Sequence, residues 1–172
     1  LTFGPALPLG MAADEEVGDI DILLDRSRED LAGMLTEAER EGMSERVVAR
    51  IRESAPPGLT IVSGGLLAPD ATKLPKLIEA ADYAVVLDET QCSEAGDRLA
   101  ARLAAPELPL TLARPRVEDG TLRFRLRVGN DGGVRPREVV QALLQTSVAD
   151  HRMRRTRLLT RRGDELVGFA SL

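Results

Sequence analysis

Residues 121–128 read Thr-Leu-Arg-Phe-Arg-Leu-Arg-Val, which is the most regular alternation in the chain. Apolar side chains alternate with arginines, and a period of two residues is that of a β-strand with one buried face. The stretch therefore predicts a strand that packs its apolar side chains against a core. The opposite side of this strand is expected to carry a row of arginines, namely Arg123, Arg125 and Arg127.

The elements expected on either side of this strand follow in a recognisable order. Glu-Asp-Gly at residues 118–120 predicts a hairpin turn, and Pro136 is expected in the first turn of a helix. The expected strands are residues 83–87, 108–115, 121–128 and 152–160, and the expected helices are residues 93–105 and 136–145. Strand, helix, strand, strand, helix, strand is the order of a ferredoxin-like (split βαβ) sandwich, which we therefore expect for residues 82–160.

The first part of the chain predicts a shorter version of the same unit. An irregular strand is expected at residues 1–10, and further strands at residues 17–24 and 59–67. Residues 28–53 have helical spacing, interrupted near Gly42 and Ser44. The expected fold class is α+β with two tandem ferredoxin-like units, the first incomplete at its N-terminus. The expected boundaries are 1–68 for the first unit, 69–81 for a connector, 82–160 for the second unit and 161–172 for a tail. The missing opening strand and helix predict that the chain is truncated at its N-terminus.

The composition excludes several kinds of cofactor chemistry. The 172 residues include one cysteine, Cys92, and one histidine, His151. An iron–sulfur cluster and a structural zinc ion each need several Cys or His ligands, so this chain alone can hold neither. We expect no cofactor and no metal. The apolar runs are too short to cross a membrane and no signal segment opens the chain, so we expect no membrane partner and a cytoplasmic location.

Positive charge gathers in the C-terminal part of the chain. From Arg114 onward, 13 arginines stand against 7 acidic residues, although the net charge of the whole chain is -5. An exposed row of arginines on a sheet suits RNA phosphates, whereas an aromatic content of 2% argues against recognition of bases by stacking. The alternative is a solvated face, or a face that the first unit covers. The candidate nucleic-acid-binding residues are Arg123, Arg125, Arg127, Arg155 and Arg157.

Four other features have simpler interpretations. We expect Cys92 in a turn before a helix, with no His or Lys near it in the sequence to activate the thiol. His151, between Asp150 and Arg152, is expected in an exposed loop, and a role as general base would need a partner in space. The stretch Gly-Asn-Asp-Gly-Gly at residues 129–133 lacks the spacing of a phosphate-binding glycine motif and is interpreted as a loop. The spacing of an acidic run matches no calcium loop, so we expect a solvated loop and edge strand. This run comprises Asp14, Glu15, Glu16, Asp19 and Asp21.

Four segments together carry a resemblance to a known family. They are Leu-Thr-Phe-Gly-Pro-Ala-Leu-Pro-Leu-Gly (1–10), Ile-Glu-Ala-Ala-Asp-Tyr (78–83), Val-Arg-Pro-Arg-Glu-Val-Val-Gln-Ala-Leu (134–143) and Arg-Arg-Thr-Arg-Leu (154–158). In order and spacing the chain resembles the radical SAM-linked, or radical SAM-associated, bacterial proteins, a family of unknown function. Members are typically encoded beside, or fused to, a B12-binding radical SAM protein, often near ribosome and ribonuclease genes. Members usually have further N-terminal residues with Ser-His-Leu-Asp and Gly-Phe-Asn-Pro segments, and both segments are absent here.

The resemblance implies a partner rather than a reaction. The chain cannot be the catalytic radical SAM subunit, because the cluster of that enzyme needs three cysteines. The resemblance and the basic C-terminal half together predict a non-catalytic accessory module that partners a radical SAM protein and presents an RNA or ribosomal substrate. Two alternatives stay open. One is an enzyme whose active site lies between the units and uses the missing N-terminal segment, and the other is a protein-interaction or dimerisation module.

Overall fold

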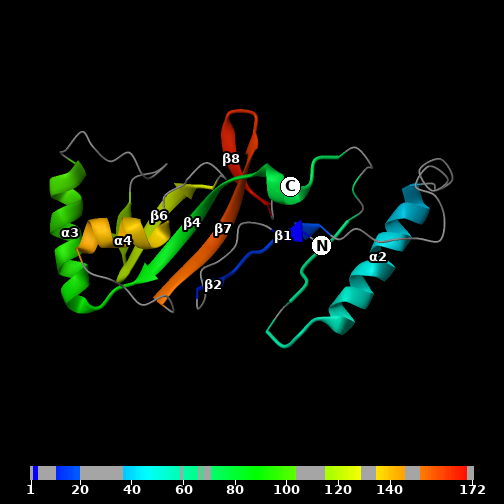
Figure 1. Ribbon diagram of the computed structural model, residues 1–172, viewed down its shortest axis with the longest axis horizontal. Coiled ribbons are helices and arrows are strands. Elements are labelled where there is room, and N and C mark those ends of the chain that lie inside the picture. The colour runs from blue at the N-terminus through cyan, green and yellow to red at the C-terminus, as the bar shows by residue number, and fades with distance from the viewer. Residues whose placement is uncertain are drawn as a thin grey trace. The chain divides into compact units, whose positions relative to one another are not determined.

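Strand β4 (Ile78–Val86) is a central strand of the main sheet in the computed structural model (Figure 1). Its antiparallel neighbours are β6 (Thr121–Arg127) and β7 (Met153–Arg162). Beyond β6 lies β5 (Arg116–Glu118). The other edge of β7 pairs in parallel with β2 (Ala12–Ala13) and in antiparallel with β8 (Glu165–Gly168). Neighbours on both sides of β7 satisfy backbone groups that an edge strand would leave open.

The structure describes residues 2–3, 11–19, 37–58, 60–65, 67, 71–103, 115–128, 135–145 and 152–169. The chain divides into two compact units. One comprises residues 1–20 and 73–172 and contains the main sheet, and the other comprises residues 21–72.

Two helices join the main sheet in this unit, so the fold class is α+β. Helix α3 (Glu89–Leu103) follows β4, and helix α4 (Pro136–Leu144) lies between β6 and β7 in the chain. From β4 to β7 the order is strand, helix, strand, strand, helix, strand, and these four strands pair in the order fourth, first, third, second. This is the order that the sequence predicts for a split βαβ unit over residues 82–160. The tandem arrangement of two such units stays a prediction.

The core lies between the sheet and these helices. Leu122, Phe124 and Leu126 are buried as the alternation predicts, and the rings of Tyr83 and Phe124 stack with their centroids 5.6 Å apart. The apolar face of α4 packs into the same cluster. The residues that α4 buries are Val139, Val140, Leu143 and Leu144.

The predicted turn between β5 and β6 is confirmed. Asp119 and Gly120 both have positive φ, at 48° and 69°, and connect strands that pair directly. Positive φ at both central residues is the requirement of the two-residue hairpin turn whose twist matches the flanking strands.

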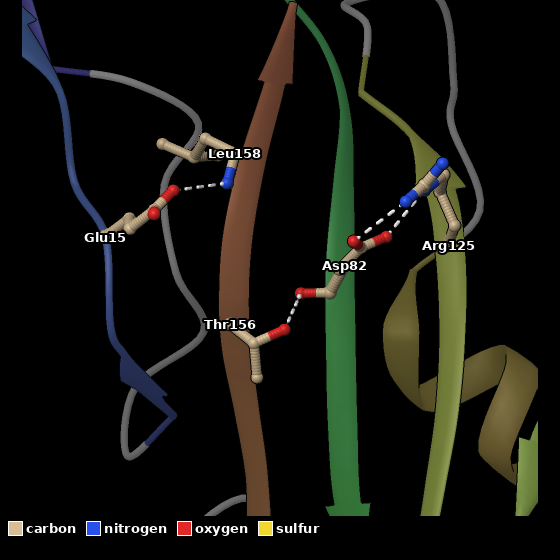
Figure 2. A network of polar contacts seen from close by, with 5 residues as sticks. All are labelled: Glu15, Asp82, Arg125, Thr156 and Leu158. Atoms are coloured by element: carbon tan, nitrogen blue, oxygen red, sulfur yellow. Dashed lines mark hydrogen bonds and ion pairs between the residues drawn. The ribbon is translucent and has the colours of Figure 1, made fainter. Parts of the chain in front are cut away.

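A β-bulge in β7 decides which side of the sheet its arginines occupy. Asp82 of β4 lies opposite Arg157, but the next residue, Tyr83, lies opposite Arg155, so Thr156 is the extra residue. Its hydroxyl donates to the carbonyl oxygen of Asp82 at 3.3 Å (Figure 2). Asp82 and Tyr83 are neighbours on β4 and point to opposite faces of the sheet. Their partners Arg157 and Arg155 therefore also point to opposite faces. Arg155 therefore lies on the core side with Tyr83, whereas Arg157 lies on the other side.

Three consecutive carboxylates fasten the segment around β2 to β7. Asp14 pairs with the guanidinium of Arg154 at 3.2 Å, and Glu16 pairs with Arg155, whose side chain is 1% exposed. Glu15 accepts a hydrogen bond from the backbone N–H of Leu158 at 3.1 Å (Figure 2). These three residues lie in a loop beside the edge strand β2, and Asp14 and Glu16 are exposed, as the sequence predicts. The sequence analysis did not predict that each carboxylate also binds a group of β7.

The remaining described part of this unit is small. Strands β1 (Thr2–Phe3) and β3 (Gly18–Asp19) form a two-stranded antiparallel sheet. The buried Asp19 accepts a hydrogen bond at 3.3 Å from the N–H of Leu74, in the 3₁₀ helix η1 (Leu74–Leu77). Of the strand expected at residues 17–24, the described residues show β3 alone.

The compact unit of residues 21–72 contains the helix α2 (Glu37–Ser54). The expected interruption near Gly42 and Ser44 is wrong, because one glycine weakens a helix by about 1 kcal/mol without ending it. Residues 60–65, expected within a strand, have no regular secondary structure. The guanidinium of Arg52 donates to the carbonyl oxygens of Ile61 at 2.9 Å and Val62 at 2.6 Å, which occupies acceptors that a neighbouring strand would use.

Helix α3 begins four residues earlier than the apolar spacing predicts. The N–H of Gln91 donates to the carboxylate of Asp88 at 2.9 Å, and the side chain of Gln91 accepts from the N–H of Asp88 at 3.1 Å. This reciprocal cap satisfies backbone donors at the start of the helix. Cys92 therefore lies in the first turn of α3 and not in a turn before it, with its N–H bonded to the carbonyl of Asp88.

We predict that Glu16→Gln lowers the stability of the protein markedly. The variant removes the charge of Glu16 from the buried Arg155, and a hydrogen bond to a charged group contributes about 1.5–3 kcal/mol to the free energy of unfolding. Asp14→Asn is the matched control, because the side chains of Asp14 and Arg154 are 43% and 58% exposed and such pairs contribute about 0–1 kcal/mol. Denaturant titration measures both variants. Equal losses would show that Arg155 does not depend on Glu16.

We predict that stability falls at alkaline pH because of Tyr83. Burial raises the pKa of Tyr83 above its ordinary value of 10.0, and the nearby Arg155 partly opposes this rise. A raised pKa favours the neutral hydroxyl in the fold, so this contribution is complete below about pH 10 and is lost as the pH rises through the folded-state pKa. Tyr83→Phe removes the titrating group and should flatten this part of the pH profile.

Denaturant titrations at about pH 8 and about pH 11 compare the two proteins. Tyr83 is the one tyrosine of the chain and there is no tryptophan, so tyrosinate absorbance follows this residue alone. Equal losses of stability in the wild type and in Tyr83→Phe would contradict the prediction.

Candidate nucleic-acid interface

The side of the main sheet that faces away from the core carries the arginines of β6. Arg123, Arg125 and Arg127 alternate with buried apolar residues, as the sequence predicts. The side chain of Arg123 is 47% exposed and that of Arg125 is 30% exposed, and Arg127 is also exposed. The row predicted from the sequence therefore exists, but its members differ in how far they reach solvent.

The pairing of the strands adds arginines to this row. Arg116 of β5 lies directly opposite Arg123, and on β7 Arg154 lies opposite Ala84 and Arg157 opposite Asp82. Residues directly opposite one another on neighbouring strands point to the same face. We call the resulting surface the arginine face. It consists of Arg116, Arg123, Arg125, Arg127, Arg154 and Arg157.

Two of these six arginines were missed in the sequence analysis. Arg116 could have been found, because a two-residue turn at Asp119 and Gly120 places residue 116 opposite Arg123. Arg154 could not have been found, because the bulge at Thr156 reverses the alternation along β7. The same bulge removes Arg155 from the set. Its side chain lies on the core side of the sheet, where Glu16 and Tyr83 hold it.

Three carboxylates neutralise part of the positive charge on this face. Asp82 accepts two hydrogen bonds from Arg125, at 2.6 Å and 3.0 Å, and both side chains are largely buried (Figure 2). This hydrogen bond raises the pKa of Arg125, so its guanidinium stays charged. Glu118 lies 3.3 Å from the Nε atom of Arg116 and 3.8 Å from that of Arg123, and so offsets the repulsion between these opposed arginines. Asp14 pairs with Arg154.

Arg127 and Arg157 differ from the other four members. Both are exposed, and within the described ranges neither forms an ion pair. The side chain of Arg157 lies over Gly168, where an added Cβ would come within 3.2 Å of its Cδ atom. Gly168 therefore leaves room for the arginine stem beside β8. An anion could therefore reach these two guanidinium groups without displacing an ion pair in the described ranges. The pKa of the Glu79 carboxyl is lowered mainly by the hydrogen bond that Arg161 donates, and the charge of Arg127 also acts on this carboxyl.

The other sequence candidates do not form a site in the part of the chain that is described. No group of three or more potential metal ligands occurs there, and Asp21, His151 and residues 129–133 lie outside the described residues. Cys92 is half-buried and packs against the core. Of the helices in the described ranges, none has both the length and the apolar character that a membrane span requires.

Fold and surface together define an α+β protein with a cationic sheet face. A family profile described as "Uncharacterized protein conserved in bacteria (DUF2344)" matches residues 1–149, and the chain belongs to this family. No curated protein and no solved structure gives a match to the chain. The family is bacterial and has no described activity, which agrees with the bacterial family of unknown function that the sequence resembles.

Proposed function

We propose that this protein is a non-catalytic accessory protein that binds RNA through the arginine face. The proposal depends on one observation, which is that strand pairing gathers six arginines from β5, β6 and β7 on one side of the sheet. Three carboxylates form ion pairs with them and a fourth, Glu79, acts on Arg127, so an excess of positive charge remains. Lys and Arg contacts to phosphates supply much of the affinity of proteins for nucleic acids.

The mode of binding follows from what the face lacks. Tyr83 and Phe124, which supply stacked rings in this unit, both lie on the core side of the sheet. Stacking on aromatic side chains is a common way to recognise individual RNA bases. Because no such ring is found among the arginine-face residues that the structure describes, we propose contacts to the phosphate backbone that depend little on sequence.

A triple arginine variant tests this function. Arg123→Gln/Arg127→Gln/Arg157→Gln removes three exposed charges and leaves the Asp82–Arg125 pair in place. Each lost phosphate contact should reduce the slope of log affinity against log salt by about 0.7 for a single strand, which gives about 2 for three contacts. Affinity should fall most at low salt, while stability should change little because exposed charges contribute little to folding.

The control removes the same charge elsewhere. Arg46→Gln/Arg50→Gln/Arg162→Gln changes three exposed arginines that do not belong to the arginine face. Fluorescence anisotropy with a labelled RNA oligonucleotide at several salt concentrations measures both variants. The control should bind as the wild type does. Equal binding by the face variant and the wild type at every salt concentration would remove the RNA proposal from this surface.

We also propose a B12-binding radical SAM protein as the partner. The support for this part is the resemblance of the four sequence segments to radical SAM-associated proteins. The accessory role agrees with the single cysteine of the chain, since the partner would have to supply the cluster thiolates.

Co-expression of this chain with a B12-binding radical SAM protein tests the partnership. We expect the two proteins to elute together in size-exclusion chromatography. Separate elution of the two wild-type proteins, each folded, would contradict the proposal.

A further inference from the structure

The central strand of the arginine face carries small side chains between two columns of arginines. On β4 the residues that point to this face include Ala84, which lies between Arg123 of β6 and Arg154 of β7. The next residue on the same side, Asp82, lies between Arg125 and Arg157. Neighbouring strands are about 4.8 Å apart, so β6 and β7 lie about 9.6 Å apart with β4 between them.

The accessible part of β4 lies toward its C-terminal end. Ala84 is partly exposed and Val86, on the same side of the strand, is 59% exposed. Ala80, toward the other end of this side, is fully buried. The carboxylate of Asp82 is turned toward Arg125 and accepts two hydrogen bonds from it, so its charge is neutralised within the protein. A narrow strip over Ala84 thus has little side-chain bulk and an arginine on each side, Arg123 and Arg154. It ends at Val86, a large exposed apolar residue that lies opposite Thr121 of β6.

We propose that a single-stranded RNA backbone, and not a duplex, lies along this strip between the two arginine columns. The inference deepens the proposed function and rests on it. Successive arginines along β6 are about 6.8 Å apart on a straight strand, and a flexible single strand can extend to follow them. A duplex is stiff and its backbones wind around an axis, so few phosphates of one backbone would reach a straight row. Arg154 would exchange its exposed pair with Asp14 for a phosphate.

The geometry points to Ala84 as the residue that sets this preference. A larger side chain at this position would occupy the strip between Arg123 and Arg154 without changing the charge of the face. A carboxylate there would also neutralise the same two arginines. Ala84→Leu and Ala84→Glu therefore separate a steric effect from an electrostatic one. Ala49, an exposed residue of α2, provides the matched control Ala49→Leu.

The experiment uses the full chain and two probes of about 12 nucleotides, a length within the site sizes of single-strand binders. One probe is an oligouridine strand and the other is the same strand paired with oligoadenosine. We expect the wild type to bind the single strand at least about tenfold more tightly than the duplex. Ala84→Leu and Ala84→Glu should each weaken single-strand binding by about tenfold, which corresponds to the loss of one or two phosphate contacts. The control Ala49→Leu should bind the single strand as tightly as the wild type does.

The outcomes distinguish this inference from the function on which it rests. Thermal melting of each variant first establishes that the variant is folded. If Ala84→Leu does not fold, Ala84→Ser is measured together with Ala84→Glu instead. If the duplex binds as tightly as the single strand and the Ala84 variants bind normally, the single-strand path is wrong. In that case, loss of binding in the triple arginine variant would still support the proposed function. If neither probe binds the wild type, both the proposed function and this inference fail.

Discussion

The extra residue at Thr156 is the constraint on which the arrangement of charge in this protein depends. Without it, Arg155 and Arg157 would lie on one face of the sheet, because they are two residues apart on one strand. The bulge sends Arg155 to the core side, where Glu16 and Tyr83 hold it, and leaves Arg157 on the arginine face. Two arginines of one strand thus have separate tasks. One fastens the N-terminal segment to the sheet, and the other is exposed to solvent.

The same division extends to the rest of the arginine face. Arg125 is largely buried and has a bidentate carboxylate partner, so it contributes mainly to the sheet. Arg127 and Arg157 are exposed and form no ion pair in the described part of the chain, so they contribute mainly to the surface potential. Arg123 and Arg154 have exposed, weakly held partners that a phosphate can replace. A protein whose net charge is negative can therefore present a local cationic surface.

The sequence predicts the regular elements well and the points of irregularity poorly. The alternation of residues 121–128, the turn at Asp119 and Gly120 and the helix at Pro136 depend on local patterns, and the structure contains all three. The bulge, the role of residues 14–16 and the aperiodic stretch at 60–65 depend on contacts between distant residues. Local spacing says nothing about such contacts. For this reason Arg123, Arg125 and Arg127 were placed correctly, whereas Arg155 was grouped with the wrong face.

The central claim is that the arginine face binds an RNA backbone, and an NMR titration tests it most directly. The arginine Nε–Hε signals of the full chain would be followed while an unstructured single-stranded RNA is added. The account predicts salt-sensitive shifts for Arg123, Arg127 and Arg157, and unchanged signals for Arg155 and Arg52, which hydrogen bonds within the protein hold in place. Shifts confined to arginines outside the arginine face, or no shifts at all, would contradict it.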